Sequence, residues 1–198
     1  MAMSVEKNEQ GKILLQIART AISRALHVSC APAAVDENIA WLSQPGATFV
    51  TLTQWDELRG CIGSLQACDP LIEDVSNNAV SAALYDPRFI PLAADELDTV
   101  NLEVSLLSEL QSLDFTSEAD ALAQLRPSID GVVFEYGPYR STFLPQVWES
   151  LPQPRQFLAR LKAKARLSED FWAEDIRLSR YTVSKWRETD YSREYAHG

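Results

Sequence analysis

The chain has 198 residues, of which 46% are hydrophobic and 23% are charged, a composition typical of folded globular proteins. Its 28 acidic and 18 basic residues give a net charge of −10, which disfavours duplex nucleic acid and anionic membrane surfaces as partners because both are themselves negative. No apolar run approaches the roughly 18 to 20 residues needed to cross a bilayer. The first ten residues lack the basic and apolar regions of a secretory signal. We therefore expect a cytoplasmic protein without membrane contact.

The first half of the chain contains helical and extended patterns in turn. Apolar residues at 3.6-residue spacing predict a helix over residues 7–27. The β-branched stretch 47–53 predicts a strand, and the short loop 54–57 turns it into a hairpin. Asp69 and Pro70 then stand in the favoured N-cap and N1 order, which predicts the start of a second helix.

The second half begins with strict alternation of apolar and polar residues over 99–107, which indicates a half-buried strand. The other predicted helices and strands in this half cover 117–125, 132–136, 139–144, 154–167 and 176–186. Neighbouring strands joined by short turns pair antiparallel, so the pattern predicts an α+β fold with a largely antiparallel sheet flanked by helices. We expect one domain over 8–187, with two sublobes as the alternative, and a flexible polar tail at 188–198.

Three cysteines, Cys30, Cys61 and Cys68, are too few and too scattered for a disulfide framework. No Cys-x-x-Cys pair occurs, and no histidine stands near Cys61 or Cys68. The sequence therefore predicts no metal site.

The segment Arg59-Gly60-Cys61-Ile62-Gly63 carries the strongest chemical signal. Glycines in a strand allow another group to approach the backbone, and exposed amides with an arginine bind anions. Cys61 between two glycines is sterically open, as a nucleophile must be. The alternative is that the glycines mark a bulge and that Cys61 is a buried packing residue.

A nucleophilic cysteine also needs a base, and the chain has only two histidines. His197 lies in the predicted tail, and His27 lies near the end of the first predicted helix. A lone histidine in such a position is more often structural, so a Cys/His pair requires the fold to bring His27 to Cys61.

Several other charged residues are candidates, each with an ordinary structural alternative. Arg88 follows Asp86 in a proline-bracketed turn and either clamps an anionic substrate or forms a structural ion pair. Glu103 and Glu135 form a carboxylate pair only if their strands are neighbours. The basic segment 155–166 is either a local anion-binding patch or a solvated helix face.

Six sequence blocks occur in the order typical of one family. Leu58-Arg59-Gly60-Cys61-Ile62-Gly63 resembles the signature hexapeptide of the AMMECR-type domain family. The other blocks are similar to the family's S-A-x3-D-x-R-F-x-P, E-V-S-L-L, H-G-V, A-T-Y-L-P-E-V and L-x-x-K-A-G patterns and lie at 81–91, 103–107, 130–132, 141–147 and 161–166. Asp130 stands where the family commonly has histidine, and Arg166 where it favours glycine.

The resemblance, which covers about residues 10–187, implies an α+β architecture with a larger and a smaller lobe around a cleft that the signature faces. It also implies a shared system with a Memo-like protein of the extradiol-dioxygenase type and a radical-SAM protein. No reaction and no cofactor follow from it. Because Asp130 replaces the family's histidine, the most obvious base or metal ligand of that loop is missing here.

Two functional hypotheses remain. In the first, the chain is a small-molecule enzyme or enzyme subunit, with Arg59, Gly60, Gly63 and Arg88 binding an anionic group beside Cys61. In the second, it is a non-catalytic scaffold that docks on partner proteins through an apolar patch near Trp148 or Trp172.

Overall fold

A computed structural model describes residues 2–28 and 39–191. The chain divides into two compact units: unit 1 comprises residues 1–107 and 184–198, and unit 2 comprises residues 108–183. Each unit contains helices and one antiparallel sheet of four strands. The predicted α+β class is therefore confirmed, with two sheets in place of one. The single domain and the cleft stay predictions.

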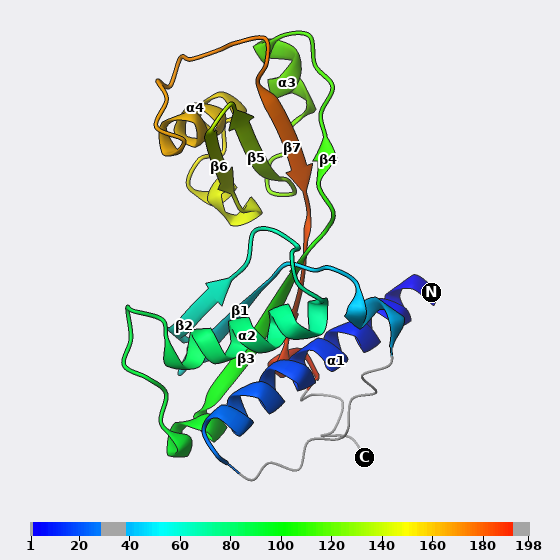
Figure 1. The fold of residues 1–198 in the computed structure, drawn as a ribbon, viewed down its shortest axis with the longest axis vertical. Coiled ribbons are helices and arrows are strands. Elements are labelled where there is room, and N and C mark those ends of the chain that lie inside the picture. The colour runs from blue at the N-terminus through cyan, green and yellow to red at the C-terminus, as the bar shows by residue number, and fades with distance from the viewer. Residues whose placement is uncertain (1, 29–38, 192–198) are drawn as a thin grey trace. The chain divides into compact units, whose positions relative to one another are not determined.

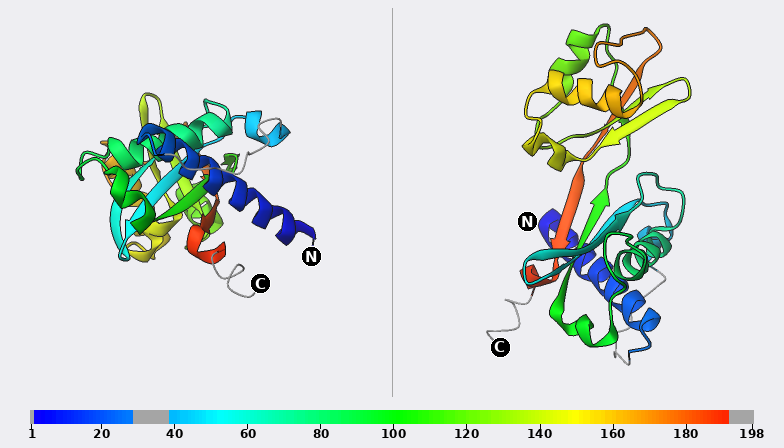
Figure 2. Two further views of the ribbon diagram at one scale, coloured as in Figure 1. Left: turned by 90° about the horizontal axis from the view of Figure 1, so that it is seen from below. Right: turned by 90° about the vertical axis from the view of Figure 1, so that its left-hand side faces the viewer.

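Unit 1 is a sheet in the order β2-β1-β3-β8 with helices on one of its faces. Its elements are α1 (Ala2–Ala25), η1 (Ala40–Ser43), β1 (Thr48–Gln54), β2 (Glu57–Gly63), α2 (Leu71–Leu84), η2 (Ala94–Thr99), β3 (Val100–Leu107), β8 (Val183–Arg187) and α5 (Glu188–Tyr191). The helices α1 and α2 lie side by side across the sheet (Figure 1; Figure 2, left). Their apolar residues and the alternate residues Val50, Leu52, Leu102 and Val104 form one buried core, as the periodicities predict.

Unit 2 has its own sheet, in the order β4-β7-β5-β6, and its own core. Its elements are β4 (Gln111–Ser112), α3 (Glu118–Gln124), β5 (Gly131–Tyr136), β6 (Tyr139–Phe143), η3 (Pro145–Glu149), α4 (Pro154–Lys164) and β7 (Arg177–Tyr181). The ring of Trp148 stacks on Phe157 with centroids 3.8 Å apart and is buried. Trp148 is thus a core residue, and the prediction that it lies in a docking patch is wrong.

Local signals explain where the elements end. The helix α1 stops in a Schellman motif, in which the Val28 N–H bonds the Ser23 carbonyl (3.0 Å) and the His27 N–H bonds the Arg24 carbonyl (3.1 Å). His27 occupies the left-handed position of this motif, with φ of 56°. The hairpin between β1 and β2 is closed by Trp55 and Asp56, both with positive φ, as a type I′ turn requires.

Three boundaries differ from the prediction. Pro70 rather than Asp69 is the N-cap of α2, because residues 69–71 are held in extended form beside 44–46 by backbone bonds. The predicted strand 176–186 is divided into β7 and β8, which belong to different sheets. The predicted tail begins with a helix, α5, whose Tyr191 is buried in the core of unit 1, while 192–198 lie outside the described residues.

The close packing of α2 on β2 at Gly60 can be tested by a substitution that adds a side chain there. A Cβ at this position would lie 2.1 Å from the carbonyl oxygen of Ala82, a backbone atom that cannot rotate away. We expect Gly60→Ala to lower the free energy of unfolding by about 3 kcal/mol, the upper range for overpacking, in urea unfolding followed by circular dichroism. Gly137→Asn is the control, because Gly137 has φ of 52° and open space around it, and asparagine tolerates that conformation. Equal stability of both variants would contradict this packing.

Candidate functional site

The edge strand β2 carries four of the five predicted site residues, Arg59, Gly60, Cys61 and Gly63, and Arg88 lies in the loop after α2. Gly60 lies against α2, and its missing side chain lets the helix backbone approach. A Cβ on Gly63 would instead lie 2.3 Å from the ring of Phe49, which therefore covers that glycine on the opposite face. Since strand side chains alternate, Cys61 shares the face of Gly63. The two glycines thus serve packing on two sides of the sheet.

Cys61 is partly exposed and is held through its backbone and its sulfur. Its N–H donates to Oδ2 of Asp86 (2.9 Å), and its carbonyl accepts from Nη2 of Arg88 (3.0 Å). Cys61 is paired with Thr51 of β1, whose hydroxyl donates to Sγ at 3.1 Å. Both backbone groups of Cys61 therefore face outward from the sheet edge, where two side chains replace a missing neighbouring strand.

Asp86 and Arg88 form the ion pair that makes this edge contact possible. The Asp86 side chain is 1% exposed, and its carboxylate accepts from Nε of Arg88 (2.9 Å), from Nη2 (2.6 Å) and from the Arg88 N–H (3.1 Å). The Arg88 guanidinium holds the pKa of Asp86 well below its usual range, although burial opposes this. Asp86 is therefore an ionised buried carboxylate.

The two predicted anion-binding arginines differ in how their donors are used. Arg59 donates from Nε and Nη2 to the carboxylate of Glu96 (3.2 and 3.0 Å) and from Nη1 to the carbonyl of Ile90 (2.9 Å). The pKa of Glu96 is lowered chiefly by this hydrogen-bonded arginine. Arg88 is 54% exposed, and its Nη1 has no hydrogen-bond partner among the residues that the structure describes. Of the two, Arg88 is the more exposed and keeps a whole terminal nitrogen, Nη1, for a ligand, whereas every guanidinium nitrogen of Arg59 already makes a hydrogen bond.

Cys61, Thr51 and Glu103 lie side by side across β2, β1 and β3, and we call them the polar row. Glu103 is two strands from Cys61, roughly 10 Å. Its carboxylate accepts from Nε of Arg187 (2.6 Å), and Nζ of Lys185 lies 3.7 Å away. The condition for a carboxylate pair of Glu103 and Glu135 is not met, because β3 and β5 belong to different sheets.

The sequence analysis does not identify a buried network of hydrogen bonds that lies next to the site. Asp74 accepts from the N–H (2.7 Å) and hydroxyl (2.6 Å) of Thr48, and from the Ser64 hydroxyl. Nδ2 of Asn78 donates to Asp74 (3.0 Å) and to Ser64 (3.0 Å). The available signal was a pair of polar residues four apart on the apolar side of α2, where buried polar groups need partners. This network fixes the chain just after Gly63.

Among the described residues, Cys61 has no hydrogen bond to a histidine and no metal-binding cluster beside it. His27 is exposed at the end of α1, and no hydrogen bond joins it to Cys61 in the described part of the chain. Asp130, in unit 2, is buried and accepts from Nε (3.0 Å) and Nη2 (2.6 Å) of Arg126. Within residues 2–28 and 39–191, no group of three or more His, Cys, Asp or Glu residues is arranged to hold a metal ion.

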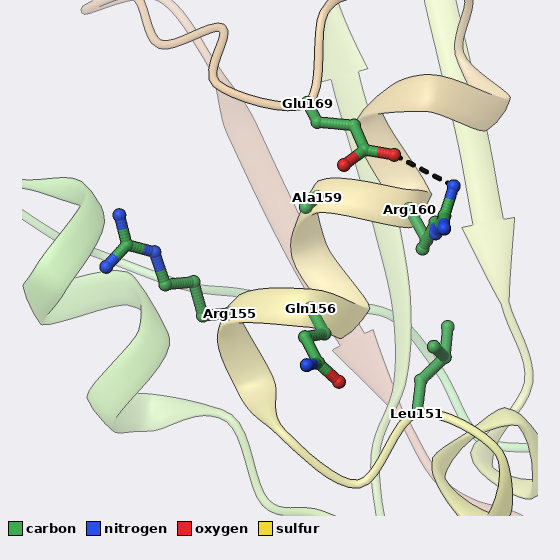
Figure 3. A pocket seen from close by; sticks show the side chains of 6 residues that line it. All are labelled: Leu151, Arg155, Gln156, Ala159, Arg160 and Glu169. Atoms are coloured by element: carbon green, nitrogen blue, oxygen red, sulfur yellow. Dashed lines mark hydrogen bonds and ion pairs between the residues drawn. The ribbon is translucent and has the colours of Figure 1, made fainter.

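The basic segment 155–166 lies on α4 and beyond its end, and several of its charges are used inside unit 2. Lys162 is buried and donates to Glu118 (2.8 Å) and to the Phe171 carbonyl (3.0 Å). A surface pocket of about 460 Å³ adjoins this helix. Nη1 of Arg160 donates to Glu169 at 2.9 Å. Figure 3 shows this pair and the Arg155 side chain pointing away from it. The residues that line the pocket are Leu151, Arg155, Gln156, Ala159, Arg160 and Glu169.

The family model of AMMECR1 matches residues 15–186. The chain belongs to the AMMECR1 family. A protein of Methanothermobacter thermautotrophicus is 35% identical over 186 residues, covering 91% of this chain and 95% of its own length. An AMMECR1-type relative in Aeropyrum pernix is 40% identical over 161 residues, covering 75% of this chain and 67% of its own.

A solved structure is also similar to this AMMECR1-family chain. The crystal structure of the uncharacterised protein PH0010 from Pyrococcus horikoshii has a TM-score of 0.73 and 30% identity, and the match covers 91% of this chain and 92% of that one. The resemblance seen in the sequence motifs is thereby confirmed. None of these names states a reaction, so they establish family and fold. In the described residues, no helix is long and apolar enough to span a membrane.

The Asp86 ion pair makes stability depend on pH in a defined direction. Because its folded-state pKa lies below the unfolded value of about 3.9, the pair contributes fully above that value and progressively less as pH falls. We expect Asp86→Asn to lower the free energy of unfolding at pH 7 by about 2 kcal/mol, below the usual range for a buried pair because Arg88 is half exposed. Urea unfolding at several pH values should show this difference shrinking below about pH 4. Asp98→Asn, at an exposed position, is the control, and a difference that stays constant down to pH 2.5 would refute the assignment.

Proposed function

We propose that this AMMECR1-family protein is a small-molecule enzyme or enzyme subunit in which the Cys61 thiol is the reacting group. The observation that carries the proposal is the way in which Cys61 is held. Its backbone is fixed from outside by Asp86 and Arg88, while the residue as a whole is partly exposed and Sγ accepts a hydrogen bond from Thr51. A reacting group needs this combination of fixed position and access.

Arg88, whose side chain is about half exposed, is the proposed anion contact of the substrate, through the Nη1 that its own hydrogen bonds leave unused. Asp86 already neutralises Arg88 and orients its guanidinium plane, so we expect a substrate with one carboxylate rather than a polyphosphate. Glu103 is the acid–base group in the polar row, at a distance that a substrate lying over Thr51 would span. Arg59, Gly60 and Gly63 support this site by shaping β2. The Memo-like and radical-SAM partners implied by the family belong to the same proposal.

A second candidate function, a protein-interaction module, is favoured by one observation. Large apolar side chains are exposed around β2, among them Trp55, Tyr85 and Ile90. Exposed apolar side chains gathered in one region are typical of docking surfaces.

Substitution of the thiol separates the two functions. Purified protein is incubated with a small-molecule extract of cells, and depleted or newly formed compounds are measured by mass spectrometry. We expect turnover by the native protein and by Cys68→Ser, and a loss of at least about a hundredfold for Cys61→Ser, the scale of a missing catalytic group. The melting temperatures of the variants should agree within a few degrees.

Alkylation by iodoacetamide gives an independent readout of the same proposal. We expect native Cys61 to be modified, and the rate of its modification to fall when a turned-over compound is present. Unchanged turnover in Cys61→Ser would disprove the catalytic role, and a large loss of stability in that variant would assign Cys61 to packing.

A further inference from the structure

Exposed apolar side chains gather along one edge of unit 1. The described chain has eight large hydrophobic residues with exposed side chains, and five of them lie between residues 55 and 90, in β2 and the segments that flank it. Three are mostly exposed: Trp55 at 78%, Tyr85 at 71% and Ile90 at 79%. The five residues are Trp55, Leu58, Leu65, Tyr85 and Ile90.

Two hydrogen bonds and the strand positions place four of these residues along β2 and its hairpin turn. The Ile90 carbonyl accepts from Nη1 of Arg59 (2.9 Å), so Ile90 lies beside β2, the strand that holds Leu58. Tyr85 directly precedes Asp86, which bonds Cys61 of the same strand. Trp55 lies at the tip of the hairpin that begins β2. We call Trp55, Leu58, Tyr85 and Ile90 the edge patch.

Exposed acidic residues lie at the hairpin end of the edge patch and give that end a negative charge. Residues 55–99 contain nine acidic residues and two basic ones. Asp74 and Asp86 are buried, and the two arginines of this stretch are paired with Glu96 and Asp86. Asp56 and Glu57 flank the tip and are exposed. Gln54 bonds the Thr99 hydroxyl at 2.7 Å, which places the exposed Asp98 near the same tip.

We propose that the edge patch and the exposed acidic residues at its hairpin end form a docking surface for a basic segment of a partner protein, one that carries arginine or lysine beside apolar side chains. Charge selects this occupant. A second copy of the chain would bring the same negative charges together, and nucleic acid and anionic lipid are negative as well. Arginine in a partner satisfies both features of the surface, since it pairs with carboxylates and stacks on an exposed indole ring.

The inference extends the second candidate function, the interaction module, by naming its partner class. It does not depend on the thiol, so Cys61→Ala is expected to bind the partner segment as the native protein does. A failure of the Cys61 chemistry and a failure of this docking surface are therefore distinguishable.

The test uses three fluorescently labelled hexapeptides and the full chain, with binding followed by fluorescence anisotropy at 0.15 M salt. One peptide alternates arginine and leucine, the second replaces leucine with serine, and the third replaces arginine with glutamate. We expect the arginine–leucine peptide to bind at least about tenfold more tightly than either of the others, because both charge and apolar contacts contribute.

Two double variants locate the binding. Trp55→Asn combined with Ile90→Ser should weaken binding at least about tenfold, as loss of a central aromatic anchor does. Asparagine favours the type I′ turn, so this variant is expected to stay folded. The matched control is Leu110→Ser with Ile129→Ser, two exposed apolar residues of unit 2, which should bind as the native protein does. Equal affinity of both double variants, absence of binding, or equal binding of the glutamate peptide would overturn the proposal. So would a native dimer in sedimentation that the Trp55→Asn/Ile90→Ser variant does not form.

Discussion

One buried carboxylate determines how the edge of the first sheet is built. Asp86 lies just after α2, is ionised, and bonds both the Cys61 N–H and the Arg88 side chain. Without it, the edge strand would leave an unpaired donor in a half-buried position. With it, the loop after α2 is tied to the strand before α2, so the helix is fixed at both ends. The sequence blocks at 58–63 and 81–91 therefore form one hydrogen-bonded unit.

Most of the secondary structure could be predicted because its signals are local. The alternation in 99–107 and the spacing in 7–27 report which face is buried, and both elements are present. The predicted boundaries were wrong where contacts with residues distant in sequence determine the backbone conformation. Residues 69–71 are held by the backbone of 44–46, so the usual capping order does not apply there. Nothing in the composition of 176–186 indicates that its two halves belong to different sheets.

The sequence predicted which residues belong to the site but not which hydrogen bonds they make. Motif reading selected Arg59, Cys61 and Arg88, which the fold does gather along β2. The motifs could not show that Glu96 accepts from Arg59, 37 residues away, or that Asp86 accepts from the Cys61 N–H, 25 residues away. Hydrogen bonds over such separations do not affect the local sequence pattern. Asp74 illustrates the same limit. Its place in the first turn of α2 suggests a simple dipole partner, whereas it lies inward and holds Thr48 and Ser64.

The division of 176–186 between two sheets also bears on the order in which the chain is completed during synthesis. Unit 2 is one continuous stretch, so all of its strands are available once residue 181 has been made. Unit 1 is discontinuous, since β8 and α5 supply its last strand, the core residues Trp186 and Tyr191, and the Glu188 carboxylate that bonds Arg19. The Arg19 side chain in α1 therefore cannot meet this partner until residue 188 has been made. During synthesis, unit 2 can therefore complete its sheet before unit 1 does, although most of unit 1 precedes it in the sequence.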